Sequence, residues 1–128
     1  MAKRTVKSVK RNIQKLLLEY ARKRDKQCIF YGKDVGKCGG VTTADHIITR
    51  GRANTYADTD NVILACFYHH LQWKPTNPTL YAKIVEEVIG KKRYKEIHEK
   101  GRILRYSMSL KEWLEEEEKL KEKLNEKA

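Results

Sequence analysis

With 128 residues, the chain has room for one domain with a modest hydrophobic core. Its 28 Lys and Arg residues against 17 Asp and Glu give a formal net charge of +11, which favours a polyanionic partner such as nucleic acid. No apolar run is long enough to span a membrane, and no signal peptide is recognisable, so we expect a cytoplasmic protein without a membrane partner. Three cysteines cannot all pair, which favours reduced thiols that bind metal or pack in the core.

Residues 1–26 are predicted to form a basic N-terminal helix. They carry ten Lys or Arg residues and two acids, Glu19 and Asp25. The helical spacing of the apolar residues predicts a helix from about residue 6 to residue 24. Its basic face could lie along a phosphate backbone. A membrane-surface helix is the alternative, but the apolar face lacks the Trp and Phe typical of one.

The middle segment, residues 27–75, changes to short apolar pieces separated by glycines. This pattern predicts short strands at Cys28–Phe30, Val41–Ile48 and Asn61–Leu64, joined by turns. Cys66–Trp73 is then predicted as a short helix that Pro75 closes.

Residues 76–128 are predicted to form a helical extension. Asn77-Pro78 indicates a helix start and Gly90 its end, and a second short helix stops at Gly101. A capping box that begins at Ser109 opens the last helix, in which the run 115–118 of four glutamates should be a solvated face. The fold class is therefore α+β, and residues 1–128 form a single domain.

Four polar residues carry the chemistry that we expect. Asp45 offers a hard oxygen ligand to Mg²⁺ or Mn²⁺, and His46 can accept a proton from water. His70, on the following helix, could reach the same ion from the other side. Asn61 could either hydrogen-bond the loop that holds His46 or join the metal shell. Each residue alone is uninformative, but the ordered set supplies what hydrolysis of a phosphodiester requires.

This order of Asp-His, loop, Asn and a Cys-containing segment that ends at His70 resembles the HNH (ββα-metal) nuclease family over about residues 27–74. The resemblance implies a small ββα-metal core. It also implies that His46 is the general base, that Asn61 is the second catalytic residue, and that Asp45 and His70 hold the catalytic ion.

Beyond this core, the segments Asn77-Pro78-x-x-Tyr81 and 89–94 (Ile-Gly-Lys-Lys-Arg-Tyr) resemble phage NinG-type recombination nucleases. This second resemblance suggests a phage or mobile-element protein that acts on branched DNA. The compartment would then be the host cell cytoplasm.

Many HNH proteins also carry a zinc knuckle of two Cys-x-x-Cys pairs, from which this chain departs. Tyr31 follows Cys28 where a second cysteine would fall, and His69 follows Cys66 where the fourth would fall. Cys38, in a Gly-rich loop, could complete a Cys₃His zinc site with Cys28, Cys66 and His69. The alternative is a decayed knuckle whose thiols simply pack.

Arg50, Arg52 and Lys74 flank the expected site and could bind the scissile phosphate, or be ordinary surface charges. The sequence thus predicts a metal-dependent DNA endonuclease that acts on duplex or branched DNA. One alternative is a non-catalytic, zinc-stapled nucleic-acid-binding module. Another is a structural subunit that docks through its last helix, and the same helix could form a homodimer. His98 is expected at the surface.

Overall fold

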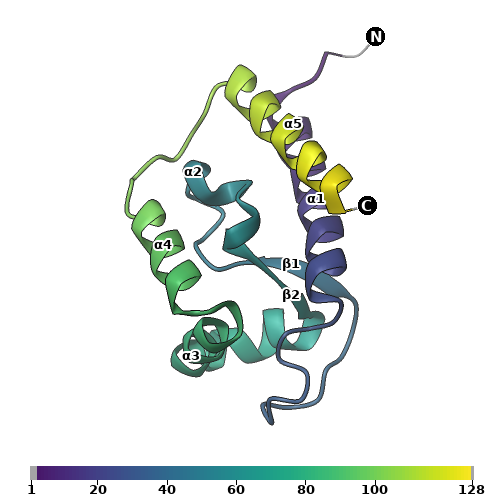
Figure 1. The fold of residues 1–128 in the computed structure, drawn as a ribbon, viewed down its shortest axis with the longest axis vertical. Helices are drawn as coiled ribbons and strands as arrows, with labels where there is room; N and C mark the ends of the chain where they lie inside the picture. The colour runs from purple at the N-terminus through teal and green to yellow at the C-terminus, as the bar shows by residue number, and fades with distance from the viewer. Residues whose placement is uncertain (1–2, 128) are drawn as a thin grey trace.

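The structure is a computed structural model that describes residues 3–127, and it places helices around a small two-stranded sheet (Figure 1). This arrangement confirms the α+β class. The helices and strands are α1 (Val6–Asp25), β1 (Thr42–His46), α2 (Ala53–Tyr56), β2 (Val62–Cys66), α3 (Pro78–Ile89), α4 (Lys91–Gly101) and α5 (Leu110–Lys127). Three further short helical turns are η1 (Thr59–Asn61), η2 (Tyr68–Trp73) and η3 (Lys74–Thr76).

The two strands pair antiparallel, with Asp45 opposite Ile63 and His46 opposite Val62. Every residue of β2 is buried, and the first two residues of the strand pack into two different hydrophobic clusters. Val62 faces a cluster formed with α1 and α5, whereas Ile63 packs into a cluster formed with η2 and α3. The sheet therefore separates two cores, and successive β1 residues face different ones.

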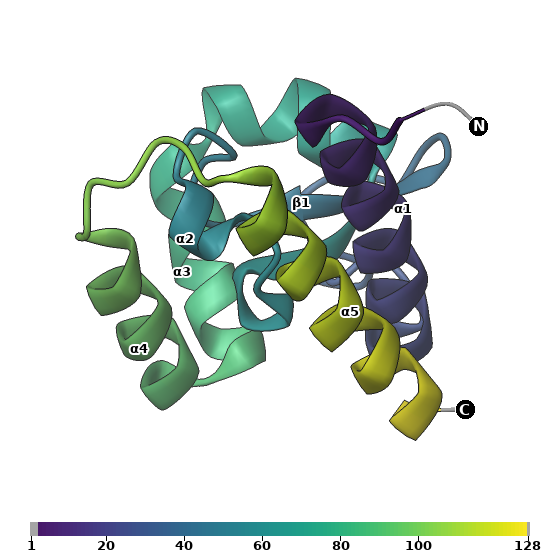
Figure 2. The same cartoon turned by 90° about the horizontal axis from the view of Figure 1, so that it is seen from above.

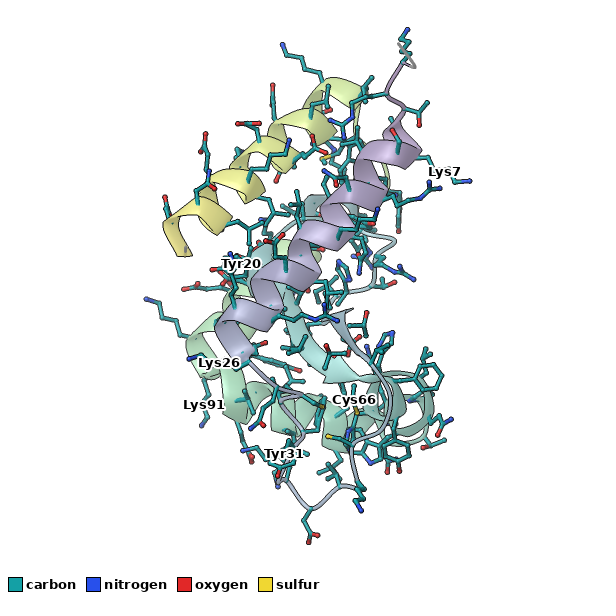
Figure 3. All side chains as sticks on the ribbon, turned by 90° about the vertical axis from the view of Figure 1, so that its right-hand side faces the viewer. Lys7, Tyr20, Lys26, Tyr31, Cys66 and Lys91 are labelled. Atoms are coloured by element: carbon teal, nitrogen blue, oxygen red, sulfur yellow. The ribbon has the colours of Figure 1, made fainter. Side chains whose placement is uncertain are left out.

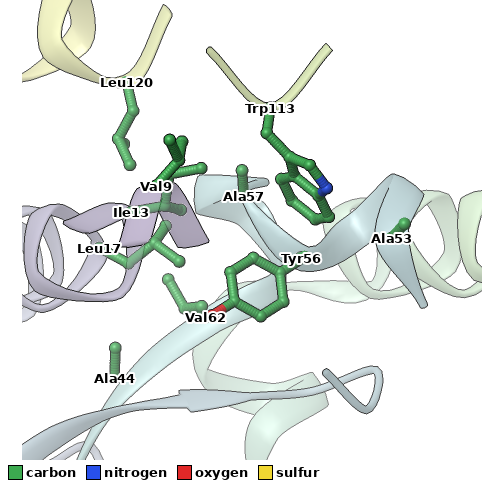
Figure 4. Close-up of a cluster of buried hydrophobic side chains, with 10 residues drawn as sticks. All are labelled: Val9, Ile13, Leu17, Ala44, Ala53, Tyr56, Ala57, Val62, Trp113 and Leu120. Carbon is green, nitrogen blue, oxygen red and sulfur yellow. The ribbon is translucent and has the colours of Figure 1, made fainter. Parts of the chain in front are cut away.

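Helices α1 and α5 lie side by side, as Figures 1 and 2 both show. Their contact surface includes Ile13 and Leu17 from α1 and Trp113 and Leu120 from α5 (Figure 4). The apolar face of the last helix is thus buried within the chain. Its capping box is confirmed, because the Glu112 amide donates to Ser109 Oγ at 3.2 Å and the Ser109 amide donates to Glu112 Oε1 at 3.1 Å.

Two expectations are wrong. Cys28–Phe30 is a turn and not a strand. Ile29 N donates one hydrogen bond to Leu64 O of β2, but the chain then reverses at Gly32, whose φ is +75°.

Glu117 is not on a solvated face. It is 3% exposed and accepts two hydrogen bonds from Arg4, at 2.7 and 2.6 Å, and one from Asn12 at 2.9 Å. A buried carboxylate thus joins α5 to α1 through Asn12 and to Arg4, which precedes α1.

The remaining expected elements are present with shifted ends. The first helix runs to Asp25. The strand predicted at 41–48 is shorter, at Thr42–His46, and the strand predicted at 61–64 lies at Val62–Cys66. The short helix before Pro75 is a π-helix, an uncommon form that often occurs at functional sites. Among the helices of residues 3–127, none combines the length and apolar character that crossing a bilayer requires.

Candidate functional site

A polar cavity of about 380 Å³ lies at the end of β1. Strand β1, helix α1 and η2 with the adjoining η3 contribute its walls, so segments far apart in the sequence meet there. It is lined by Gln14, Thr43, Ala44, Asp45, His46, Ile47, Thr49, Arg50, His70 and Lys74. The structure therefore brings together Asp45, His46 and His70, which the sequence had placed in one site.

Asp45 is the centre of the hydrogen-bonding array in this cavity and is 1% exposed. Its Oδ1 accepts a hydrogen bond from Lys74 Nζ at 2.8 Å, and its Oδ2 accepts one from the Tyr81 hydroxyl at 2.6 Å. Burial alone would raise the pKa of Asp45, but the His70 ring, the Lys74 ammonium and the Tyr81 hydroxyl together hold it below its ordinary value. Asp45 is thus a fixed carboxylate, charged at neutral pH.

His70 lies against the same carboxylate, with its Nδ1 2.9 Å from Asp45 Oδ1 at ion-pair distance. This Nδ1 is buried, and no described residue makes a hydrogen bond of good geometry with it. Two ligand atoms on neighbouring positions of an octahedral Mg²⁺ ion, each about 2.1 Å from it, are separated by about 3 Å. The Asp45–His70 pair therefore fits two adjacent ligands of one cation. A carboxylate has about four lone-pair positions, so the Lys74 and Tyr81 contacts leave room for such a bond.

His46 is oriented by a backbone carbonyl. Its Nε2 lies 2.9 Å from Tyr56 O, and because a carbonyl only accepts, Nε2 must carry the proton. In the neutral ring the lone pair is then on Nδ1. Burial, followed by the charges of Arg50 and Lys74, lowers the pKa of His46 to about 4, so the ring is neutral at physiological pH. His46 is positioned to accept a proton through one defined atom.

Asn61 holds the loop that follows His46. It is fully buried, accepts from Ile48 N at 2.7 Å, and donates to Ile48 O at 3.1 Å and to Thr55 O at 3.0 Å. Of the two roles that the sequence left open, these contacts place Asn61 in the loop-holding one. Its side-chain oxygen is directed at a backbone amide and its nitrogen at two carbonyls.

The three basic residues expected to bind phosphate occupy different places. Arg50 is exposed at the rim of the cavity and makes no hydrogen bond or ion pair with any described residue. Arg52 is engaged within the protein, since its Nη1 donates to Gly101 O at 2.5 Å and its guanidinium lies over the Tyr106 ring. Lys74 lies on Asp45, inside the cavity. Arg50 is the one of these three with a free cationic group.

The second cluster of polar side chains comprises Cys28, Cys38, Cys66 and His69, whose ligand atoms all lie within 4.8 Å of one another. His69 Nδ1 lies 3.7 Å from the sulfurs of Cys28 and Cys38, and 3.1 Å from that of Cys66. A tetrahedral zinc with Zn–S of about 2.3 Å and Zn–N of about 2.0–2.1 Å separates N and S by about 3.6 Å. The cluster therefore has the composition and spacing of a Cys₃His metal site.

The backbone carbonyl of Val35 fixes the ring of His69 in this cluster. His69 Nε2 lies 3.1 Å from Val35 O, so Nε2 carries the proton and Nδ1 presents its lone pair to the thiols. Burial opposes ionisation of Cys66, but backbone amides including those of His69 and Gly39 lower its pKa to about 6. Burial and the nearby Cys28 raise the pKa of Cys38 to about 12. The cluster thus holds one thiolate, two thiols and an imidazole whose Nδ1 lone pair faces them. A bound cation would favour loss of the two remaining thiol protons.

The loop that carries Cys38 is held against η2. Phe67 N donates to Val41 O at 2.9 Å, and Tyr68 N donates to Gly39 O at 3.0 Å. Gly40 has φ +81°, and a Cβ there would lie 2.5 Å from the Phe67 Cβ. Only glycine permits this close approach, which brings Cys38 from ten residues beyond Cys28 back to the cluster. In Figure 3 the labelled Cys66 lies beside this loop.

Sequence reasoning missed Tyr81, Gln14 and Tyr56. Tyr81 belongs to the apolar stripe of α3, but it is 6% exposed and its hydroxyl is on Asp45. Gln14 lines the cavity from α1, where its Oε1 is buried and has no hydrogen-bond partner among the residues that the structure describes. Tyr56 orients His46 through its backbone, a role that no side-chain pattern reveals.

His98, which was expected at the surface, is half-buried, and its ring lies 4.3 Å from that of Tyr94 between centroids, with the two planes tilted by 47°. Comparisons of the chain with protein-family models, with curated proteins and with solved structures found no match. The site must therefore be interpreted from its own geometry.

Proposed function

We propose that this protein is a divalent-metal-dependent DNA endonuclease of the HNH (ββα-metal) type. The observation that carries the proposal is the buried His70 Nδ1 at 2.9 Å from Asp45 Oδ1, in a cavity that also holds His46 and Arg50. Two metal ligands, a neutral imidazole and a free guanidinium in one polar cavity constitute the groups that phosphodiester hydrolysis needs.

In this proposal the side chains have separate roles. His46 accepts the proton of a water molecule through Nδ1 as the water oxygen attacks phosphorus, and Tyr56 O stabilises the imidazolium that forms. The P–O3′ bond breaks and the ends are a 5′-phosphate and a 3′-hydroxyl. Asp45 and His70 would hold Mg²⁺ or Mn²⁺, which supplies Lewis-acid stabilisation of charge on the phosphate oxygens. Arg50 binds the phosphate or its neighbour.

Zinc at Cys28, Cys38, Cys66 and His69 would act as a structural staple. Cys28 precedes the turn, Cys38 is in the Gly-rich loop, and Cys66 and His69 lie at the junction of β2 and η2. A metal there ties together three segments of a small core. The rival function, a zinc-stapled module that binds nucleic acid without cutting it, needs this staple but does not need Asp45 and His70.

Helix α1 supplies a surface for the DNA backbone. Lys7 and Arg11 are exposed and stand about two turns and one turn before Gln14, on the same side of the helix as this cavity-lining residue. Figure 3 shows the length of α1 with Lys7 near its start and Lys26 just after its end. Arg4 and Arg24, by contrast, are used in contacts within the protein. Part of the basic helix is therefore free to contact phosphates beside the cavity.

The test is cleavage of supercoiled plasmid and of a synthetic four-way junction with Mg²⁺, with Mn²⁺ and with EDTA. His70→Ala and His46→Ala are expected to lose cleavage and to keep DNA affinity. Gln72→Ala is the matched control, since Gln72 is exposed on the same helix as His70 and should cut like the wild type. Circular dichroism and zinc content verify that each variant is folded.

The two functions give opposite results. If the wild type binds both substrates and cuts neither with any cation, the endonuclease proposal is wrong and the binding module replaces it. A preference for the junction over plasmid would favour branched DNA as the substrate.

A further inference from the structure

A second cavity, of about 500 Å³, adjoins the first and has a different character. Helices α3 and α4 form its far side, and aromatic and proline rings dominate its walls, including those of Tyr81, Tyr94, Pro75 and Pro78. The two cavities share His70, Lys74 and Ile47. A ligand in the apolar cavity would therefore lie next to a phosphate bound beside Asp45 and His70, with the side chains of His70 and Lys74 between them.

Tyr94 is the most accessible aromatic ring in this cavity, since it is half-buried and lies beside His98 with centroids 4.3 Å apart and planes tilted by 47°. The Tyr81 ring is more enclosed, because Lys74 Nζ lies 4.5 Å from its centroid and its hydroxyl is used by Asp45. DNA has one large apolar surface, which is the face of its bases, and bases that leave the duplex stack between aromatic and apolar side chains.

We infer that this cavity takes an unpaired nucleobase of the DNA strand whose phosphate lies at Asp45 and His70. The inference rests on the proposed function, since it needs DNA at the first cavity. It identifies the substrate class as DNA with an unpaired nucleotide next to the cleaved bond. A paired base is unable to enter because it remains stacked in the duplex, whereas an unpaired base enters at low cost.

The experiment is equilibrium binding of the zinc-loaded protein without added Mg²⁺ or Mn²⁺ at fixed salt, so that cleavage plays no part. Three duplexes of the same length are compared: fully paired, with one unpaired nucleotide, and with an abasic residue in place of that nucleotide. The wild type is expected to bind the second about tenfold more tightly than the other two, in line with one base stacked on aromatic rings. Tyr94→Ala should abolish that difference and leave the affinity for paired duplex unchanged.

A second variant tests whether Tyr94→Ala acts through the cavity or through misfolding. Ala82 lines the cavity and is half-buried, so Ala82→Phe fills the space without removing any ring and should also abolish the difference. Tyr31→Ala is the control, because Tyr31 is 63% exposed and lies outside the cavity. Equal binding of all three duplexes by the wild type would overturn the inference, as would a preference that persists with the abasic duplex or in Ala82→Phe. Metal-dependent cleavage of plasmid tests the endonuclease itself, so the two failures remain distinct.

Discussion

The hydrogen bond from Tyr81 to Asp45 is the contact through which α3 holds the candidate metal ligand. Tyr81 is 6% exposed, Asp45 is 1% exposed, and their oxygens are 2.6 Å apart. Tyr81→Phe removes only the hydroxyl and leaves the ring in the core. A hydrogen bond to a charged group contributes roughly 1.5–3 kcal/mol, and a buried acceptor left without its donor costs a similar amount. We therefore expect the free energy of unfolding to fall by about 2 kcal/mol at neutral pH.

The assay is urea denaturation at neutral pH with zinc at a fixed saturating concentration, since metal-linked unfolding otherwise depends on zinc. A double-mutant cycle with Asp45→Asn isolates the interaction. Because the neutral amide no longer presents a charged acceptor, Tyr81→Phe should cost much less in that background. The matched control is Tyr94→Phe, which removes a hydroxyl from a half-buried tyrosine that makes no hydrogen bond to Asp45.

Two results would refute this reasoning. Tyr81→Phe could unfold at the same urea concentration as the wild type, which would mean that the hydroxyl contributes nothing. It could also cost as much in the Asp45→Asn background as in the wild type, which would mean that the loss comes from packing and not from the carboxylate.

Two further predictions concern charges elsewhere. Arg4 and Asn12 lower the pKa of Glu117 from 4.5 to about 2, so this residue stabilises the fold above pH 4.5 and the stability is lost as the pH falls toward 2. Each pKa unit corresponds to about 1.36 kcal/mol, and because Arg4 is half-exposed we expect about 2 kcal/mol. Thermal melts from pH 7 to pH 2.5 should show this loss of stability in the wild type and not in Glu117→Gln. Glu118→Gln, which changes an exposed glutamate, is the control and should behave like the wild type. Arg50→Ala should leave the melting temperature unchanged and lower kcat/KM for DNA cleavage roughly tenfold to hundredfold, and unchanged cleavage would exclude Arg50 from phosphate binding.

The sequence predicted best those features that local chemistry determines. Helix α5 begins where its capping box indicated, because Ser109 and Glu112 are three residues apart and satisfy each other's backbone amides. Gly90 likewise separates α3 from α4, with φ +92°. The four possible zinc ligands were predicted from the likeness to a zinc knuckle and the spacing of its cysteines, and the structure does bring them together.

Features that depend on distant partners could not be predicted in this way. Glu117 is buried because Arg4, which is 113 residues away, reaches it, and nothing in the glutamate run distinguishes it from its neighbours. Tyr81 lies in an apolar stripe, and its polar role depends on Asp45, which is 36 residues away in the sequence. Cys28–Phe30 has the composition of a strand, but its cysteine and Phe30 are packed around His69 in a turn.

Adjacent histidines couple the two candidate metal sites. His69 Nδ1 faces the three thiols, whereas His70 Nδ1 faces Asp45, and both belong to the π-helix η2. A zinc ion bound by His69 and Cys66 would fix the start of η2 and with it the position of His70.

Removal of zinc should therefore abolish Mg²⁺-dependent cleavage although zinc takes no part in the reaction. Cys66→Ser should have the same effect and should lower the free energy of unfolding by several kcal/mol, because it removes a ligand of the staple. Activity should return to the zinc-depleted wild type on addition of zinc and not on addition of more Mg²⁺. Full activity in zinc-depleted protein would show that η2 holds His70 without the metal, and the cluster would then serve packing alone.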